Sequence, residues 1–271
     1  MDPGAGTLSK RSGGTVDKII LAAVFLGMLA GMILFMEAGY RIARRRMARN
    51  PAMERPGLGV VEGAMFALLG LILAFTFSGA ASRFDARRHL VGEEANAIGT
   101  AYLRLDLLPE NRRAELKGDF RRYLEGRIEL FRSAGDAKRV RDLSAGNRAL
   151  QAKIWTAATK AAEEAGGAAP ILLLPALNAM IDITTTREVA TMTHPPITVF
   201  ILMGGVALVC AILAGYAMAG ARRQSWLHWA GFAMILAITM AAIIDIEYPR
   251  RGLIRVDSVD KVMVELLQSM K

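Results

Sequence analysis

Apolar residues are concentrated in four long runs that charged sequence separates from one another. The runs cover residues 19–40, 60–81, 197–219 and 226–246, and each exceeds the roughly 20 residues that a helix needs to cross a bilayer. None contains lysine or arginine, and the acidic residues near them lie close to their ends, where a charge costs least. The pattern therefore predicts four transmembrane helices.

The second run continues into polar sequence without any helix-breaking residue. No proline occurs between Pro56 and Pro109, so a single helix is expected from Val60 to Leu108. At about 1.5 Å per residue this helix would be on the order of 70 Å long, more than twice the hydrocarbon thickness. Apolar residues recur at helical spacing in its polar half: Val91, Ala95, Ile98, Ala101, Tyr102 and Leu105.

The sequence between the second and third runs is amphipathic and predicts further helices. One amphipathic helix is expected within residues 109–135, and a looser one is expected at 143–165. The apolar part of residues 170–196 is too short to span a membrane, so it predicts a buried helix or helix pair. After the fourth run an extended segment leads to a short helix capped by Asp257 or Ser258. The predicted fold is an all-α membrane protein with four transmembrane helices and a helical soluble domain inserted between the second and third. The predicted parts are a flexible tail (1–17), helices 1 and 2 (18–81), the helical domain (82–196), helices 3 and 4 (197–246) and a C-terminal segment (247–271).

Composition supports this division and excludes several kinds of protein. The chain is 53% hydrophobic, above the roughly 45–50% of soluble domains. A net charge of +9 accompanies no nucleic-acid-binding motif, and the arginines flank apolar runs, where they attract anionic headgroups, so no nucleic-acid partner is expected. One cysteine, Cys210, permits no intrachain disulfide. The three histidines are scattered, so neither a metal site nor a cofactor is predicted.

Catalysis has no positive support in the sequence. Glu93 and Glu94 are the most conspicuous acid pair, but adjacent residues on a helix point about 100° apart and do not face each other. An ion pair with Arg187 or Arg88 inside the helical domain is the favoured interpretation. There is no nucleophile elbow, phosphate loop or dinucleotide motif, so the protein is expected not to be an enzyme. The predicted polar cluster of the domain comprises Arg83, Asp85, Arg87, Glu94 and Arg187.

Within the second run, Ala67, Leu71 and Phe75 recur every four residues and share one helix face. Periodicity alone favours packing in the core of the chain. If several chains instead assembled with this face toward an axis, the three residues would form an apolar neck, which can gate ions by dewetting. Small residues, among them Gly27, Gly31, Gly63, Gly204, Gly205 and Gly215, also suit close helix packing, within one chain more than in a dimer.

Three stretches resemble bestrophins. The run FTFSGAASRFDARRHL (75–90) is similar to the end of their second helix, REVATMTHPPIT (187–198) to the segment entering their third, and DIEYPRRG (245–252) with DSVD (257–260) to the acidic stretch after their fourth. EGAMFALLGLILAFTFSGAASRFDARR (62–88) and IEYPRRGLIRVD (246–257) more closely resemble the bacterial bestrophin-like membrane family.

The resemblance implies a homopentamer around a pore lined by the second helix, with Ala67, Leu71 and Phe75 at the neck and the helical domain in the cytoplasm. It implies a passive channel for inorganic ions in the bacterial inner membrane, with the lipid bilayer as the other partner. Calcium-binding acids of animal bestrophins are represented only by Asp245 and Glu247. The arginine-rich first loop points to the opposite orientation under the positive-inside rule. A non-conducting scaffold, or more remotely a membrane hydrolase, is the alternative.

Overall fold

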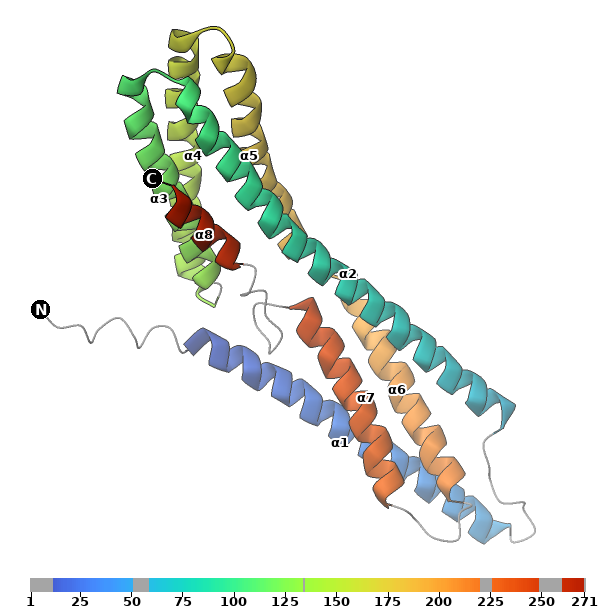
Figure 1. Cartoon of the computed structure of the whole chain (residues 1–271). Coiled ribbons are helices and arrows are strands. Elements are labelled where there is room, and N and C mark those ends of the chain that lie inside the picture. Colours follow the sequence, from blue (N-terminus) through green and yellow to red (C-terminus); the bar gives the residue numbers. More distant parts are fainter. Residues whose placement is uncertain (1–11, 51–58, 134, 220–225, 249–259, 271) are drawn as a thin grey trace, which may run out of the picture. The chain divides into compact units, whose positions relative to one another are not determined.

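The computed structural model describes residues 12–50, 59–133, 135–219, 226–248 and 260–270, with side chains from residue 19 onward in the first range. Within these ranges every regular element is helical (Figure 1). The elements are α1 (Ser12–Arg49), α2 (Val60–Arg104), the 3₁₀ turn η2 (Leu105–Leu107), α3 (Glu110–Arg132), α4 (Ala137–Ala165), α5 (Ala169–Met192), α6 (Ile197–Met218), α7 (Trp226–Glu247) and α8 (Asp260–Ser269). The all-α fold class predicted from the sequence is confirmed.

Among the described residues, four helical stretches are long and apolar enough to cross a membrane, in agreement with the four predicted runs. They are Ile19–Arg49, Val60–Leu107, Ala169–Met218 and Trp226–Glu247. The third stretch is interrupted at residues 193–196, which are not helical, so α6 alone corresponds to the predicted run at 197–219.

Several helix ends differ from the sequence expectations. Helix α1 already begins at Ser12, inside the expected tail, because extending an existing helix is easier than starting one. Helix α4 starts at Ala137, since the Asp136 carboxylate accepts hydrogen bonds from the N–H groups of residues 138 and 139, each at 3.0 Å, and caps the first turn. Residues 169–192 form one helix, α5. The proposed caps at 257 and 258 lie outside the described residues.

The chain divides into two compact units. The membrane unit contains residues 15–82 and 194–248, and the helical unit contains residues 1–14, 83–193 and 249–271. The inserted domain expected at 82–196 is close in extent to the segment 83–193 of the helical unit. Helix α8 belongs to the helical unit as well, where it packs on α3.

Glycines set the packing of α1 on α6 in the membrane unit. A Cβ atom built on Gly39 would overlap the carbonyl oxygen of Ile212, and one built on Gly215 would overlap the carbonyl oxygen of Met36. Only glycine therefore permits this approach of the two backbones. The other glycines that the sequence singled out contribute less, since a side chain on Gly27, Gly63 or Gly205 would meet nothing within 4 Å.

The helical unit has a core of its own, built from α2 through α5 with α8. All six stripe residues predicted on the polar half of α2 are buried in it. From α3 it receives Leu116, Phe120, Tyr123, Leu124 and Ile128, and from α8 Met263. The three- and four-residue spacing of these apolar side chains is what makes α3 a core helix.

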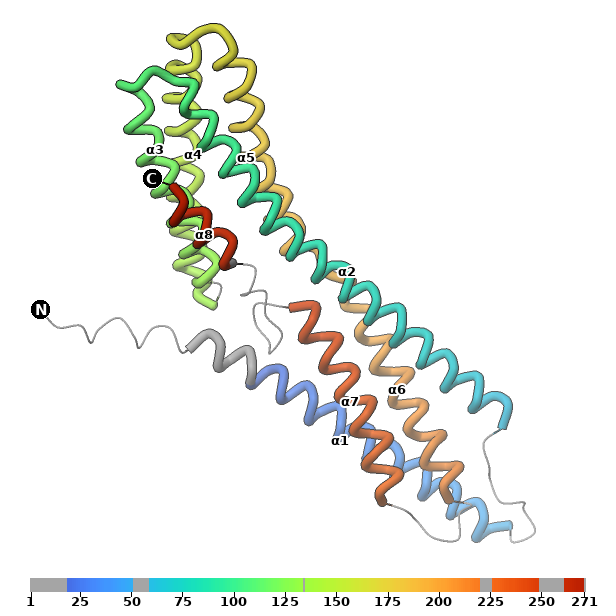
Figure 2. The backbone as a smooth tube through the Cα atoms, in the orientation of Figure 1, coloured from blue at the N-terminus to red at the C-terminus, as the bar shows by residue number. Residues whose placement is uncertain are grey.

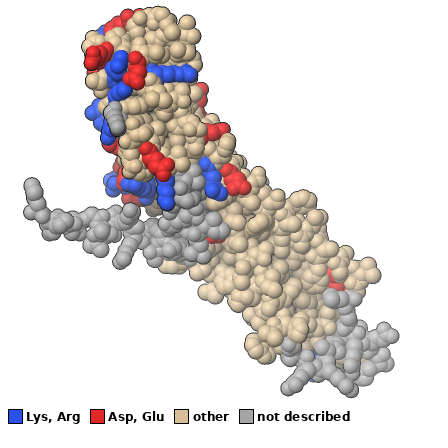
Figure 3. All heavy atoms as spheres, viewed as in Figure 1, with Lys and Arg blue, Asp and Glu red and all other residues tan. Residues whose placement is uncertain are grey.

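Helix α2 contributes to both units as one continuous helix of 45 residues (Figure 2). At 1.5 Å per residue it is about 68 Å long, close to the length expected from the sequence. Charged side chains gather over the helical unit, whereas the visible surface of the membrane unit is almost free of them (Figure 3). This contrast fits a membrane unit whose surface meets hydrocarbon.

Candidate functional site

Helix α2 presents two different faces within the membrane unit. Leu69, Leu73 and Ala80 are buried and pack in the apolar cluster shared with α6 and α7. The opposite face is exposed, and it carries the three neck candidates: Ala67 is exposed, Leu71 is 53% exposed and Phe75 is 70% exposed. Packing inside the core of a single chain, the interpretation that periodicity favoured, is therefore wrong for these residues.

The exposed residues of α2 in the membrane unit are both small and large. The small ones are Gly63, Ala64, Ala67, Gly70, Ala74 and Ser78, and the large ones are Val60, Val61, Leu68, Leu71, Phe75 and Phe77. The exposed faces of the neighbouring helices hold fewer small residues and carry mainly large aliphatic groups. These are Ile197, Ile201, Leu202 and Val209 on α6, and Leu227, Met234, Ile235 and Ile238 on α7. Large aliphatic side chains suit contact with lipid tails, whereas small ones allow helices to approach closely.

In the helical unit, α2 carries a buried charge network centred on Glu94. Arg127 of α3 donates from Nε to Oε1 of Glu94 at 2.5 Å, and Arg187 of α5 donates from Nη1 to Oε2. Glu94 is fully buried, and both guanidinium groups lie over the ring of Phe131, at 5.1 and 4.1 Å from its centre. Burial alone would lower the pKa of Arg127, but the adjacent Glu94 carboxylate raises it. The network joins three helices.

The remaining members of the predicted polar cluster lie elsewhere. Arg87 donates hydrogen bonds to the carbonyls of Ala190 and Thr193, at 3.0 and 2.9 Å, and so caps the end of α5. Asp85 is exposed and lies 3.7 Å from Arg88. Arg83 is partly buried and has interactions of its own. The structure thus brings Glu94 and Arg187 together, adds Arg127, and separates the others.

Further buried polar contacts link α3, α4 and α5. The Tyr123 hydroxyl accepts a hydrogen bond from Nε2 of Gln151 at 3.0 Å, and burial raises the pKa of Tyr123 to about 12. Asp119 is buried as well. Burial would raise its pKa, but hydrogen bonds from Lys153 and Arg122 lower it below its ordinary value. Sequence reasoning missed these groups, whose only signal is a polar residue on the apolar face of an amphipathic helix.

Two buried acids end α7 in the membrane unit. Oε1 of Glu247 lies 3.0 Å from Nδ1 of His194, whose ring stacks on Tyr248 with centroids 4.6 Å apart. Asp245 is also buried and has partners. Among the described residues no group of three or more His, Cys, Asp or Glu side chains is placed to hold a metal ion.

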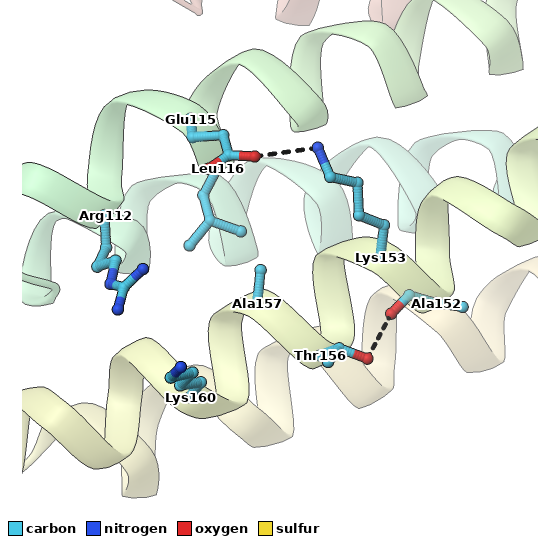
Figure 4. A pocket seen from close by; sticks show the side chains of 8 residues that line it. All are labelled: Arg112, Glu115, Leu116, Ala152, Lys153, Thr156, Ala157 and Lys160. Atoms are coloured by element: carbon cyan, nitrogen blue, oxygen red, sulfur yellow. Dashed lines mark hydrogen bonds and ion pairs between the residues drawn. The ribbon is translucent and has the colours of Figure 1, made fainter.

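An open cavity of about 550 Å³ lies between α3 and α4 (Figure 4). Its cations are mostly neutralised: Arg112 forms a two-point ion pair with Glu164, and Lys153 pairs with Glu115 at 3.1 Å. Apart from these groups and Lys160, the wall is Leu116, Ala152, Thr156 and Ala157. The lining places no nucleophile beside a base, so it gives no argument for catalysis.

Comparisons with known proteins agree with this architecture. A family model described as a Bestrophin-like domain matches residues 21–260. Comparison with curated proteins gives no match. Among solved structures, the chain resembles crystal structures of a bacterial bestrophin homologue from Klebsiella pneumoniae. One variant of it has a TM-score of 0.70 at 12% identity, with 92% of this chain and 97% of that chain covered. A form phased by Zn-SAD has a TM-score of 0.67 at 13% identity, covering 90% and 97%. At these identities the likeness establishes the fold.

Proposed function

Because the chain belongs to the bestrophin-like family of membrane proteins, we propose that it forms a homo-oligomer that conducts inorganic ions passively along α2. In the pentamer that the resemblance to bestrophins implies, the exposed face of α2 is turned toward the axis. Ala67, Leu71 and Phe75 then form the narrow apolar neck.

The observation that carries this proposal is the difference between the exposed faces of the membrane helices. The exposed face of α2 includes many small residues among its large ones, whereas the exposed faces of α6 and α7 consist mainly of large residues. A face rich in glycine and alanine gains little from lipid contact but lets copies of the same helix pack closely. Beyond the first turn, Leu71 and Phe75 are its most exposed large side chains, at 53% and 70%, so they would narrow a passage between the copies.

An apolar neck acts on ions through water. A narrow apolar constriction holds water poorly, and an ion that passes it must lose part of its hydration shell. The barrier depends on the width of the neck and does not select the sign of the ion. The neck therefore makes conduction sensitive to side-chain size at Leu71 and Phe75.

The proposed location is the bacterial inner membrane, with the helical unit in the cytoplasm. The similarity to bestrophins supports this orientation, although the arginines after the first span favour the reverse under the positive-inside rule. The proposed role is passive conduction without catalysis.

Purified full-length protein in planar bilayers tests the proposal. Native mass spectrometry should show a homo-oligomer, and the reconstituted oligomer should give single-channel currents in symmetric salt. Leu71→Ala should raise the unitary conductance, because a smaller side chain widens the neck. Phe77→Ala is the matched control. Phe77 is 45% exposed but lies about 120° from Leu71 around the helix, so its loss should leave the conductance unchanged.

The same experiment separates the channel from the scaffold alternative. An intact oligomer that carries no current across a range of salts, pH values and voltages would reject conduction and favour a membrane scaffold. A monomer in native mass spectrometry would reject the assembly itself. Equal conductance changes in Leu71→Ala and Phe77→Ala would show that the neck lies elsewhere.

A further inference from the structure

The last turns of α1 carry an unusual concentration of positive charge. Helix α1 leaves its apolar part at Tyr40 and continues unbroken to Arg49. Five arginines project from this extension and all are exposed: Arg41, Arg44, Arg45, Arg46 and Arg49. We call them the arginine cluster.

Most of this charge is not neutralised by the residues that the structure describes. Arg41 pairs with Glu37 at 2.6 Å, and Nη1 of Arg46 lies 3.5 Å from the Tyr216 hydroxyl. Arg44, Arg45 and Arg49 make no ion pair with any residue that the structure describes. Three solvated guanidinium groups therefore remain available at the end of a membrane helix.

The rest of the membrane unit fixes where this cluster lies. The close contacts at Gly39 and Gly215 hold the end of α1 against the end of α6, and the bond from Arg46 to Tyr216 lies just beyond them. In the sequence, Arg222 and Arg223 follow α6 and Arg55 follows α1. The acids of these segments are Glu37, Glu54 and Glu62, so arginine is in clear excess.

Aromatic rings mark the depth of this end in a membrane. The Tyr40 and Trp229 rings meet edge to face with centroids 5.7 Å apart, and Trp226 beside them is 76% exposed. Tyr216 of α6 lies near the same level, since its hydroxyl reaches Arg46. Tyrosine and tryptophan collect at the level of lipid headgroups, so the arginine cluster emerges there.

We propose that the arginine cluster, with Arg44, Arg45 and Arg49 as its main contacts, binds the phosphate headgroups of anionic phospholipids at this end of the membrane unit. Guanidinium groups match phosphate by paired hydrogen bonds. Each basic residue near an anionic membrane surface contributes about 1 kcal/mol, or about fivefold in affinity, so three contribute on the order of 100-fold. The inference stands independently of ion conduction.

Native mass spectrometry of the full-length protein tests this lipid preference. The protein is equilibrated in detergent with equal amounts of phosphatidylglycerol and phosphatidylcholine of the same acyl chains, and the bound ratio is measured. We expect at least a tenfold preference for phosphatidylglycerol in the wild type. This is lower than the roughly 100-fold estimated for an anionic membrane, because detergent dilutes the lipid and weakens the surface potential. The triple variant Arg44→Gln, Arg45→Gln, Arg49→Gln should lose most of that preference.

A matched control removes the same charge elsewhere. Arg132, Arg141 and Arg148 are exposed residues of the helical unit without ion pairs among the described residues, and their triple replacement by glutamine should keep the wild-type preference. Millimolar inorganic phosphate should not displace the lipid. Displacement by phosphate would show a free-anion site and overturn the lipid assignment. An unchanged preference in the α1 variant, or equal losses in both variants, would also overturn it.

A second measurement does not depend on the folding of any variant. Wild-type protein in phosphatidylglycerol nanodiscs should unfold at a higher temperature than in phosphatidylcholine nanodiscs, because a ligand of the native state stabilises it. Equal melting temperatures in the two lipids, together with no preferential adduct, would reject the inference.

Discussion

Glu94→Gln should weaken the helical unit severely, because Glu94 is the carboxylate that two buried guanidinium groups share. Arg127 and Arg187 both donate to it across the interior, with Phe131 beneath them. Removing one partner from a buried ion pair costs about 3–5 kcal/mol. Since Arg187 keeps further contacts, the expected loss is near the lower end, about 3 kcal/mol. That is a large part of the roughly 5–15 kcal/mol that stabilises a typical domain.

The fluorescence of Trp155 in α4 reports unfolding of the helical unit once Trp226 and Trp229 are replaced by phenylalanine. At about 2–4 °C per kcal/mol, Glu94→Gln should lower the melting temperature by roughly 6–12 °C. Glu93→Gln is the matched control: its side chain is 46% exposed and pairs with His89 at 3.1 Å, so the cost should be below about 1 kcal/mol. Similar melting temperatures for the two variants would refute the assignment of Glu94 as a buried structural charge.

Three further predictions concern packing and protonation. Gly215→Val should destabilise the membrane unit by about 1–3 kcal/mol or more in denaturant unfolding, whereas Gly205→Val should change little, because only the former side chain meets backbone. Met263→Ala should cost about 2–5 kcal/mol, since its side chain is fully buried, and raise protease sensitivity of the C-terminus; unaltered sensitivity would contradict docking of α8. The pKa of Tyr123 is raised from 10.0 to about 12 in the folded protein. The stabilisation that the neutral Tyr123 hydroxyl gives the folded state is therefore complete below about pH 10 and is lost as the pH rises toward about 12. Between pH 9 and 11 the wild type should lose about 1 kcal/mol more stability than Tyr123→Phe, and equal losses would contradict the shift.

Periodicity and composition predicted the helices well because local physics sets them. The absence of proline between residues 56 and 109 predicted the continuous α2, and the apolar stripe from Val91 to Leu105 predicted which side of it is buried. Both features depend on chain geometry that neighbouring residues already determine.

Tertiary features were harder to predict, and the errors have identifiable causes. Periodicity favoured a core position for Leu71, but a helix with two apolar faces does not indicate which face its own chain covers. Gly39 was not singled out, because its partner Ile212 is distant in sequence. Arg127 was not singled out, because its pairing with the buried Glu94 carboxylate depends on the packing of α3 against α2. The favoured interpretation of the glutamate pair, an ion pair with Arg187 or Arg88, is confirmed for Glu94 and Arg187.

Thiol modification at position 71 tests the central claim most directly. In a Cys210→Ala background, Leu71→Cys protein is reconstituted in planar bilayers and treated with a charged methanethiosulfonate reagent. Leu73→Cys is the control, because Leu73 is only 9% exposed and faces the core. If the exposed face of α2 lines the ion path, the reagent should reduce the current of Leu71→Cys and leave that of Leu73→Cys unchanged. An undiminished current after complete labelling of position 71, or no current from the intact oligomer, would contradict the account.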